Sequence, residues 1–234
     1  MRIGVLTAMA KEHACIAALL EEGRSIHDVF DYTLGRLGRG EVVLQSCGIG
    51  KVNAAVGTSE LIRRFSPQCV ISTGVAGGVS SAGVGVLDVV VGARVVQHDV
   101  ALHMGFARGE IEGQPRFFEA DAGLLSLAMS LGRPSLRAGL ICTGDQFITE
   151  PGELRGILDG FPDALAVDME SCAIAQTCYL YGVPFLSMRV ISDTPGVPGH
   201  QEQYEDFWGE MATRSFGTTR AFLEALSRGG GCSK

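Results

Sequence analysis

Acidic residues follow three apolar runs of this sequence, at positions where strands would end. Glu12 comes shortly after the first run, Glu170 follows a run in the second half of the chain, and Asp193 follows the last one. In open α/β sheets, ligands bind beyond the carboxyl ends of the strands. A carboxylate only accepts hydrogen bonds, so Glu170 is suited to receive them from a pair of hydroxyl groups. The spacing therefore indicates a site for a small polar ligand.

Each acidic residue also has a plain structural interpretation. A carboxylate in a first helical turn is stabilised by the helix dipole, which would explain Glu12 as the start of a helix. Asp168 can cap the helix that follows it, with Glu170 in the first turn. Asp193 precedes the turn-rich segment Thr194 to Gly199, which is either an ordinary turn or a loop that acts as a lid. Both interpretations stay open at this point.

Arg189 is unusual because it lies inside an apolar run, where a charged side chain is rare unless it is paired. Glycines gather after three other runs, at Gly48 to Gly50, Gly74 to Gly78 and Thr143 to Asp145. Glycine lets backbone N–H groups approach a ligand closely, although a tight turn also explains each cluster alone. The Gly-x-Gly at Gly48 to Gly50 lacks the third glycine of a dinucleotide fingerprint, so this motif is weak.

Short apolar runs alternate with longer segments of helical periodicity along the chain. We predict strands at Arg2 to Thr7, Glu41 to Cys47, Cys69 to Thr73, Val86 to Gln97, Gly139 to Thr143, Leu165 to Val167 and Phe185 to Ile191. We predict helices at Lys11 to Leu20, Lys51 to Phe65, Ala122 to Ser130, Met169 to Tyr181 and Tyr204 to Leu226. Apolar strands separated by helices indicate an α/β fold, with a mixed, mostly parallel central sheet flanked by helices.

Length and composition limit the class of protein. The 234 residues, 46% of them hydrophobic, fit a single α/β domain with a sizeable core. The net charge of −7 argues against nucleic acid as a partner, because nucleic acid attracts basic surfaces. Seven cysteines without a C-x-x-C pair indicate free thiols in a reducing compartment. We predict no signal peptide and no membrane span, and therefore expect a cytoplasmic protein.

Together with His98-Asp99 and the stretch Thr143 to Ile148, these motifs resemble the 5′-methylthioadenosine/S-adenosylhomocysteine nucleosidases, a family of the purine nucleoside and uridine phosphorylase superfamily. The resemblance runs in the same order along nearly the whole chain. It implies a nucleoside phosphorylase-like domain over residues 1–227 and a flexible tail over residues 228–234. It also implies hydrolysis of the bond between ribose and adenine, without a cofactor or metal, in a homodimer that binds neither nucleic acid nor membrane.

By this resemblance, Glu12 orients and deprotonates the attacking water, and Asp193 donates a proton to N7 of adenine. Glu170 holds the 2′- and 3′-hydroxyls of the ribose. Met104 and Pro115 match the segment that reaches into the partner subunit's pocket. The remaining substrate-binding residues are expected around the two catalytic ones: Met9, Ile49, Gly77, Phe147, Ile148, Asp168, Met169, Arg189, Ser192 and Tyr204.

The resemblance also divides these residues among the parts of the nucleoside. Phe147 stacks on the base, whose edge meets the backbone of Ile148, and Met169 lies against the sugar. Ser192 supports Asp193. Apolar side chains form the 5′ side, which holds a thioether, although core packing would explain them as well: Met9, Ile49 and Tyr204.

Two positions depart from the family. Val75 stands where several relatives have serine, and Asp168 is one methylene shorter than the usual glutamate. Water rather than phosphate is expected as the nucleophile, because Glu12 would repel phosphate and no arginine is near Gly48 to Gly50 or Gly74 to Gly78. The alternatives are a phosphorylase of the same fold, a futalosine or aminodeoxyfutalosine hydrolase, and an inert nucleoside-binding module.

Overall fold

One sheet of ten strands frames the molecule in the computed structural model, which describes residues 1–103, 105–211 and 216–229. The strands are β1 (Arg2–Thr7), β2 (Glu21–His27), β3 (Asp31–Leu37), β4 (Gly40–Ser46), β5 (Cys69–Gly78), β6 (Val89–Gln97), β7 (Phe118–Glu119), β8 (Leu136–Thr143), β9 (Ala164–Asp168) and β10 (Phe185–Asp193). Their order is β10-β6-β8-β9-β5-β1-β4-β3-β2, with β7 beside β6. The pairings β1–β4, β1–β5, β5–β10, β6–β8 and β8–β9 are parallel.

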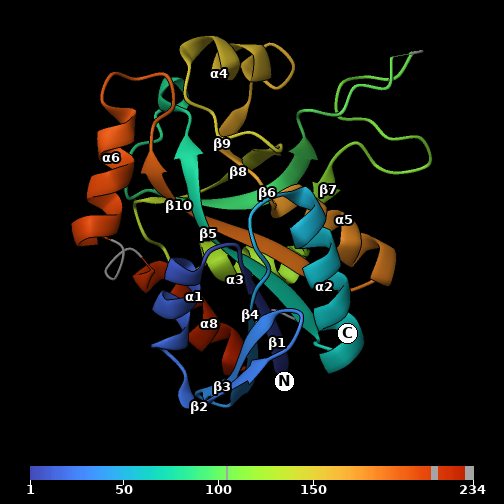
Figure 1. Cartoon of the computed structure of the whole chain (residues 1–234), viewed down its shortest axis with the longest axis vertical. Coiled ribbons are helices and arrows are strands. Elements are labelled where there is room, and N and C mark those ends of the chain that lie inside the picture. The colour runs from blue at the N-terminus through green and yellow to red at the C-terminus, as the bar shows by residue number, and fades with distance from the viewer. Residues whose placement is uncertain (104, 212–215, 230–234) are drawn as a thin grey trace.

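The last strand closes part of this sheet on itself. β10 pairs with β6 on one side and with β5 on the other, so β5, β9, β8, β6 and β10 form a closed ring. β1, β4, β3 and β2 extend the sheet outward from β5, toward the bottom of Figure 1. The ring and its extension share β5, which therefore touches both halves of the molecule.

Helices cover both faces of the sheet. α2 (Lys51–Phe65) and α5 (Ser171–Tyr181) lie side by side on one face, while α1 (Ala10–Ala17), α3 (Ala122–Met129) and α8 (Gly217–Ser227) pack on the other (Figure 1). The remaining pieces are α4 (Pro151–Leu158), α6 (His200–Asp206) and the short helical turns η1 (Ser80–Ala82) and η2 (Phe207–Met211). No helix in the described ranges is long and apolar enough to cross a membrane. The predicted α/β class, with a mixed and largely parallel sheet flanked by helices, is confirmed.

Alternation along β10 explains how a charged residue fits inside a buried strand. Every residue of β10 is buried. Leu186 and Met188 belong to the core layer shared with α1, α3 and α8. Arg189 has the opposite parity, like Phe185 and Ile191, and therefore lies on the face that α5 covers. This parity brings the guanidinium to the start of α5, where acidic residues are.

The sequence patterns do not predict several of these elements, among them β2, β3 and α4. β2 and β3 form an antiparallel hairpin at the edge of the sheet, and β2 is almost entirely exposed, so no apolar run marks it. α4 is only eight residues long. Its start carries Pro151 and a capping pair, Glu150 and Glu153, which is a local signal that a search for long periodic segments overlooks.

Some predicted boundaries are wrong. β5 does not end at Thr73 but continues through residues 74–78, because residues 74–77 pair with β10 and residues 77–78 pair with β9. The single helix predicted from Tyr204 to Leu226 is divided into the end of α6, η2 and α8, which begins at Gly217. The helix predicted from Lys11 to Leu20 ends at Ala17. The tail predicted at 228–234 lies outside the described residues from position 230 onward.

Cysteine side chains lie in and around the cores rather than in a cross-linked framework. Cys15, Cys47, Cys142, Cys172 and Cys178 are free thiols. Burial raises the pKa of Cys47 to about 12, and burial likewise raises the pKa of Cys142. These buried thiols therefore stay protonated and act as small apolar side chains.

Candidate active site

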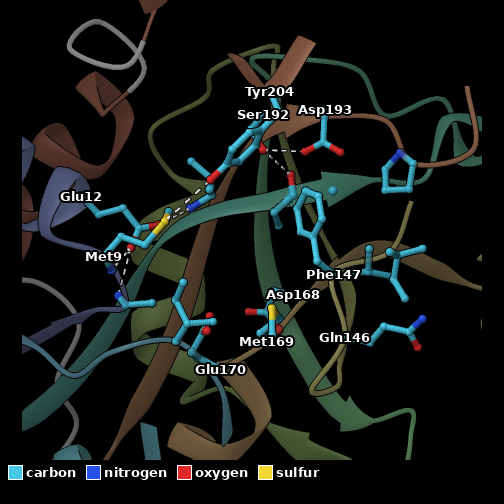
Figure 2. Close-up of a pocket in the computed structure, with 18 residues that line it drawn as sticks. Met9, Glu12, Gln146, Phe147, Asp168, Met169, Glu170, Ser192, Asp193 and Tyr204 are labelled. Atoms are coloured by element: carbon cyan, nitrogen blue, oxygen red, sulfur yellow. Dashed lines mark hydrogen bonds between the residues drawn. The ribbon is translucent and has the colours of Figure 1, made fainter. Parts of the chain in front are cut away.

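A cavity opens where the carboxyl ends of β1, β5, β9 and β10 come together (Figure 2). It holds about 600 Å³ of empty space, part of it open to solvent, which is the size expected for a small-molecule site. The turn before α2, the loop after β8, the loop after β10 and Tyr204 of α6 complete the wall. Figure 2 shows Tyr204, Ser192 and Asp193 along the top of the cavity, Met169 and Glu170 at the bottom, and Met9 and Glu12 at the left.

Glu12 is held in the first turn of α1 and is 1% exposed. Its Oε2 accepts hydrogen bonds from the N–H groups of Ala8 and Met9, both at 2.9 Å, and its Oε1 accepts one from the N–H of Val75 at 2.9 Å. Burial raises the pKa of Glu12, while the charge of Arg189 and these N–H groups oppose the shift. Glu12 thus caps the start of α1 and also presents a carboxyl with raised proton affinity.

Arg189 lies beneath the cavity and is 1% exposed. Its Nε lies 2.8 Å from Asp168 Oδ2 and donates a hydrogen bond to Ser171 Oγ at 3.1 Å. Its Nη2 donates to Ser72 Oγ at 2.9 Å and lies 3.9 Å from Glu170 Oε2. β10 therefore supplies the buried cation that balances carboxylates from β9 and the start of α5.

Asp168 supports Arg189 and the start of α5. Its Oδ1 accepts a hydrogen bond from Thr143 Oγ1 at 2.6 Å. Its Oδ2 accepts from the N–H of Ser171 at 3.1 Å and from the Ser171 hydroxyl, in addition to Arg189. Asp168 therefore accepts a hydrogen bond from the first N–H group of α5, although the N-cap position itself is Glu170 and not Asp168. Both carboxylate oxygens of Asp168 thus contact protein groups. This side chain, one methylene shorter than a glutamate, therefore positions Arg189 and Ser171.

Glu170 stands at the N-terminus of α5 and is 5% exposed. Its Oε1 accepts a hydrogen bond from the N–H of Gly50 at 2.9 Å. Burial raises the pKa of Glu170 to about 7; the charge of Arg189 opposes this shift, and the charge of Asp168 adds to it. The carboxyl is therefore oriented by the turn before α2.

Asp193 ends β10 where the pairing of this strand with β5 becomes irregular, and its side chain is buried. Its Oδ1 accepts a hydrogen bond from Ser192 Oγ at 2.7 Å. Its Oδ2 is buried and has no hydrogen-bond partner among the described residues. Burial raises the pKa of Asp193, while Ser192 and His200 oppose that shift. A buried carboxyl with one unpartnered oxygen is suited to hold a proton and to donate it.

Negative charge exceeds positive charge around the cavity. Among the described residues, Arg189 is the one buried arginine or lysine, whereas four carboxylic acids at the cavity are buried: Glu12, Asp168, Glu170 and Asp193. In surroundings of low dielectric constant, such an excess favours protonation and stabilises a ligand atom that becomes positive. The electrostatics therefore suit a reaction whose transition state gains positive charge.

Two aromatic rings form the apolar wall. The centroids of Phe147 and Tyr204 are 5.6 Å apart, with the rings tilted by 65°. Phe147 is 51% exposed, so its ring is accessible to a flat ligand. Tyr204 Oη donates a hydrogen bond to Met9 Sδ at 3.7 Å. The wall thus combines a stacking surface with a soft, sulfur-containing side.

The structure brings most of the predicted site residues to this cavity. Its lining includes Met9, Glu12, Ile49, Gly77, Phe147, Ile148, Asp168, Met169, Glu170, Ser192, Asp193 and Tyr204. Arg189 is not part of the lining but contacts Asp168 and Glu170, which are. Pro115 is not part of the lining, and Met104 lies outside the described residues.

Sequence reasoning missed several contacts. The lining also contains Ala8, Ala76, Gln146, Val167 and Pro195, most of which adjoin a predicted residue in sequence. The sequence places no arginine near Gly74, yet a Cβ at this glycine would lie 2.6 Å from Arg189 Nη1. This proximity arises from the pairing of Gly74 with Arg189 between β5 and β10, which local sequence cannot reveal.

Comparisons with known proteins point the same way as this geometry. Residues 2–224 match the family model of the phosphorylase superfamily. A 5′-methylthioadenosine/S-adenosylhomocysteine nucleosidase from Hydrogenovibrio crunogenus is 36% identical over 97% of this chain and 98% of its own length. A protein of the same name from an Exiguobacterium species is 42% identical, over 83% of this chain and 85% of its own. The solved structure of such a nucleosidase from S. pneumoniae, with the transition-state inhibitor MT-ImmA, has a TM-score of 0.90 at 33% identity, covering 97% of this chain and 100% of that one.

Proposed function

Because this chain belongs to the 5′-methylthioadenosine/S-adenosylhomocysteine nucleosidases of the phosphorylase superfamily, we propose that it acts on these two nucleosides and also on 5′-deoxyadenosine. The enzyme is a hydrolase of the N-glycosidic bond and releases adenine together with the 5′-substituted ribose. The observation that carries the proposal is the pair of buried carboxyls, Glu12 and Asp193, in one cavity with excess negative charge.

In the proposed mechanism, Asp193 is the general acid. It donates a proton from Oδ2 to N7 of adenine, which makes the base a better leaving group. As the C1′–N9 bond breaks, the ribose gains oxocarbenium character. The carboxylates of Glu12 and Glu170 stabilise this charge more in the transition state than in the ground state. Water then forms the bond to C1′, and its proton passes to Glu12.

The remaining roles follow the shape of the cavity. Glu170 accepts hydrogen bonds from the ribose 2′- and 3′-hydroxyls, and Met169 packs against the sugar. Phe147 stacks on adenine, whose edge meets the backbone of Ile148, and Ser192 orients the acid. The 5′ substituent lies against apolar and sulfur-containing groups, which suit a thioether: Met9, Ile49 and Tyr204.

Water is the nucleophile in this proposal, and phosphate is not. A phosphate would need free cationic donors, but the guanidinium of Arg189 is already engaged by Asp168, Ser171 and Ser72. It would also meet the carboxylate of Glu12. The shared fold leaves phosphorolysis as the competing reaction.

The decisive experiment is product analysis after the protein is incubated with methylthioadenosine, with and without phosphate. We expect free adenine and unphosphorylated methylthioribose, at a rate that phosphate does not change. A ribose 1-phosphate product would make the protein a phosphorylase. Intact methylthioadenosine would contradict the substrate proposal, and futalosine or aminodeoxyfutalosine would then be assayed in its place.

We also propose that two copies of the chain form a homodimer. On the outer face of α2 and α5, large apolar side chains are exposed: Val52 (74%), Val56 (52%), Tyr179 (56%) and Leu180 (65%). Ile49 (51% exposed) connects this face to the cavity. Part of the segment between β6 and β7 extends away from the body beside the same face, in green at the upper right of Figure 1. A second copy would cover the face, and the extended segment, with Met104 and Pro115, would reach the partner's cavity.

We propose further that residues 1–227 act as one nucleoside phosphorylase-like domain in the cytoplasm. The free thiols support a reducing compartment. Isolation of the protein with these cysteines oxidised to disulfides would contradict this placement.

A further inference from the structure

Lys51, Asp99 and Asp145 form an ion cluster next to the cavity, although none of the three lines it. Lys51 Nζ lies 2.7 and 2.8 Å from the two carboxylate oxygens of Asp99. Asp99 Oδ2 accepts a hydrogen bond from the N–H of Asp145 at 3.0 Å, and Asp145 Oδ1 accepts one from the N–H of Lys51 at 2.7 Å. The cluster thus joins the start of α2, the segment after β6 and the loop after β8.

Asp145 supplies the cap that α2 lacks. The N-cap of this helix is Gly50, which has no side chain and a φ of 95°. A Cβ at Gly50 would lie 3.1 Å from Asp145 Oδ1, so glycine permits the backbone conformation and also leaves room for the carboxylate. The N–H of Gly50 donates to Glu170 Oε1 at 2.9 Å. The turn that Asp145 fixes is therefore the turn that orients Glu170.

The loop that carries Asp145 continues directly into Phe147, which is part of the apolar wall, and Ile148, which also lines the cavity. The cluster therefore ties this wall to the carboxyl of Glu170. We infer that Lys51 is a positioning residue for the reaction, whose ammonium holds the base-binding loop in register with the ribose-binding carboxyl. The identity of the ligand in this inference rests on the proposed function.

The surroundings of Lys51 distinguish it from an ordinary surface ion pair, which contributes little. Its side chain is 20% exposed, and Nζ also donates to Gln97 Oε1 at 3.3 Å. Nζ lies 3.9 Å from Asp145 Oδ2 as well. Without this charge, the carboxylates of Asp99 and Asp145 would repel each other while they hold the N–H groups of both segments. Loss of the ammonium should therefore displace the loop.

Lys51→Met keeps the aliphatic stem and removes the charge, whereas Lys51→Arg keeps the charge. We expect Lys51→Met to raise both the KM for methylthioadenosine and the Kd for adenine about tenfold. Both constants depend on the loop after β8, which carries Phe147. The kcat and its pH profile should stay within about twofold, since Glu12 and Asp193 do not touch the cluster. Lys51→Arg should keep KM and Kd within about threefold of the wild type.

Two controls separate positioning from stability. Arg63→Met removes a positive charge from the exposed end of the same helix and should change neither constant. Higher ionic strength should raise the KM of the wild type but not that of Lys51→Met, in which no cluster remains to be screened.

Unchanged KM and Kd in Lys51→Met, with only a lower Tm, would show that Lys51 merely stabilises the fold, and the inference would be wrong. A lower kcat with a displaced pH profile would overturn it too. Adenine binding tests the cluster without catalysis. If adenine binds and responds to Lys51→Met while methylthioadenosine stays intact, the proposed function fails and the positioning inference stands; a wild type that binds no adenine would overturn the inference.

Discussion

Asp193 and Ser192 form a pair in which the first residue holds a proton and the second regulates how tightly it is held. The Asp193 side chain keeps one oxygen on the Ser192 hydroxyl and leaves the other without a partner among the described residues. Burial raises the pKa of Asp193, so its protonated form persists to higher pH than that of an exposed aspartate. The proposed acid therefore keeps its proton over a pH range in which an exposed aspartate has lost its own.

Asp193→Asn should lower kcat by about 10²- to 10⁴-fold, because an amide cannot supply the proton to N7. In the wild type, activity should fall as pH rises through the raised pKa of Asp193, and the variant should lack this alkaline limb. Ser192 lowers the pKa of Asp193, so Ser192→Ala should move the same limb to higher pH. Steady-state kinetics across the pH range measure all three effects. A limb that persists in Asp193→Asn would assign the proton to another group.

At the residue scale, much of the site could be predicted from sequence, because its acidic residues lie at the carboxyl ends of strands or shortly after them. The structural and chemical interpretations of Glu12 turn out to be compatible, since the same carboxylate caps α1 and lines the cavity. The environment of Arg189 could not be predicted. Its contact with Ser72 joins residues 117 positions apart, and only the pairing of β5 with β10 brings them together.

At the scale of elements, three structural units meet at Gly74 of β5. A Cβ at this position would strike Glu12 Oε1, on α1, and would lie 2.6 Å from Arg189 Nη1, on β10. Glycine is therefore required here by close packing. The predicted end of the strand at Thr73 was wrong for the same reason, because a cluster of glycines is typical of the end of a strand, whereas here Gly74 lies inside the strand and permits close packing.

Gly74→Ala should lower kcat/KM by about a hundredfold or more, because a small displacement of the Glu12 carboxylate has a large effect on rate. Overpacking should also reduce the free energy of unfolding by about 1–3 kcal/mol. Gly85→Ala is the matched control, since a Cβ there meets no atom within 4 Å. Kinetics and urea unfolding of the two variants provide the test, and a fully active Gly74→Ala would show that Glu12 and Arg189 tolerate displacement.

The elements that the sequence did not predict share a physical cause. β2 is exposed along most of its length and is held by its partner β3 rather than by an apolar face of its own. α4 depends on its capping pair and on packing against the ring. In both cases tertiary neighbours supply what local periodicity lacks, so a search for apolar runs passes over them.

At the scale of the whole molecule, the site lowers the stability of the fold at neutral pH. The pKa of Glu170 is about 7 in the folded chain, against an ordinary value of 4.5. Because the folded value is the higher one, the stability that Glu170 contributes is complete below pH 4.5 and is lost as pH rises through 7. The wild type should therefore lose stability, relative to Glu170→Gln, between these two pH values.

Urea unfolding of both proteins at pH 4.5 and pH 7 measures this difference. Each unit by which the pKa is displaced corresponds to about 1.4 kcal/mol, so the effect is large enough to resolve. Glu112→Gln, at an exposed position, should follow the wild type. If the wild type and Glu170→Gln lost stability equally, burial of Glu170 would not be the cause.

The apolar face of α2 and α5 leads to a prediction about assembly. Val52→Glu should convert the proposed dimer into monomers, because it places a charge on the surface to be buried. Sedimentation would detect the change, and activity should fall with it, since each cavity would lose the partner's segment. Val29→Glu is the control, because Val29 is exposed (81%) on another part of the surface. A wild type that sediments as a monomer would refute the dimer.

The position of β10 in the chain also sets the order in which the molecule can be built. β10 is the last strand to leave the ribosome, yet it is the strand that closes the ring between β5 and β6. Contacts between segments so distant in sequence form slowly, because long loops must close first. The nascent chain therefore carries Glu12, Asp168 and Glu170 before the positive charge of Arg189, on β10, has been added. The catalytic pocket is expected to be the last part of the protein to fold, and a chain that stops before residue 185 would have a framework without a working site.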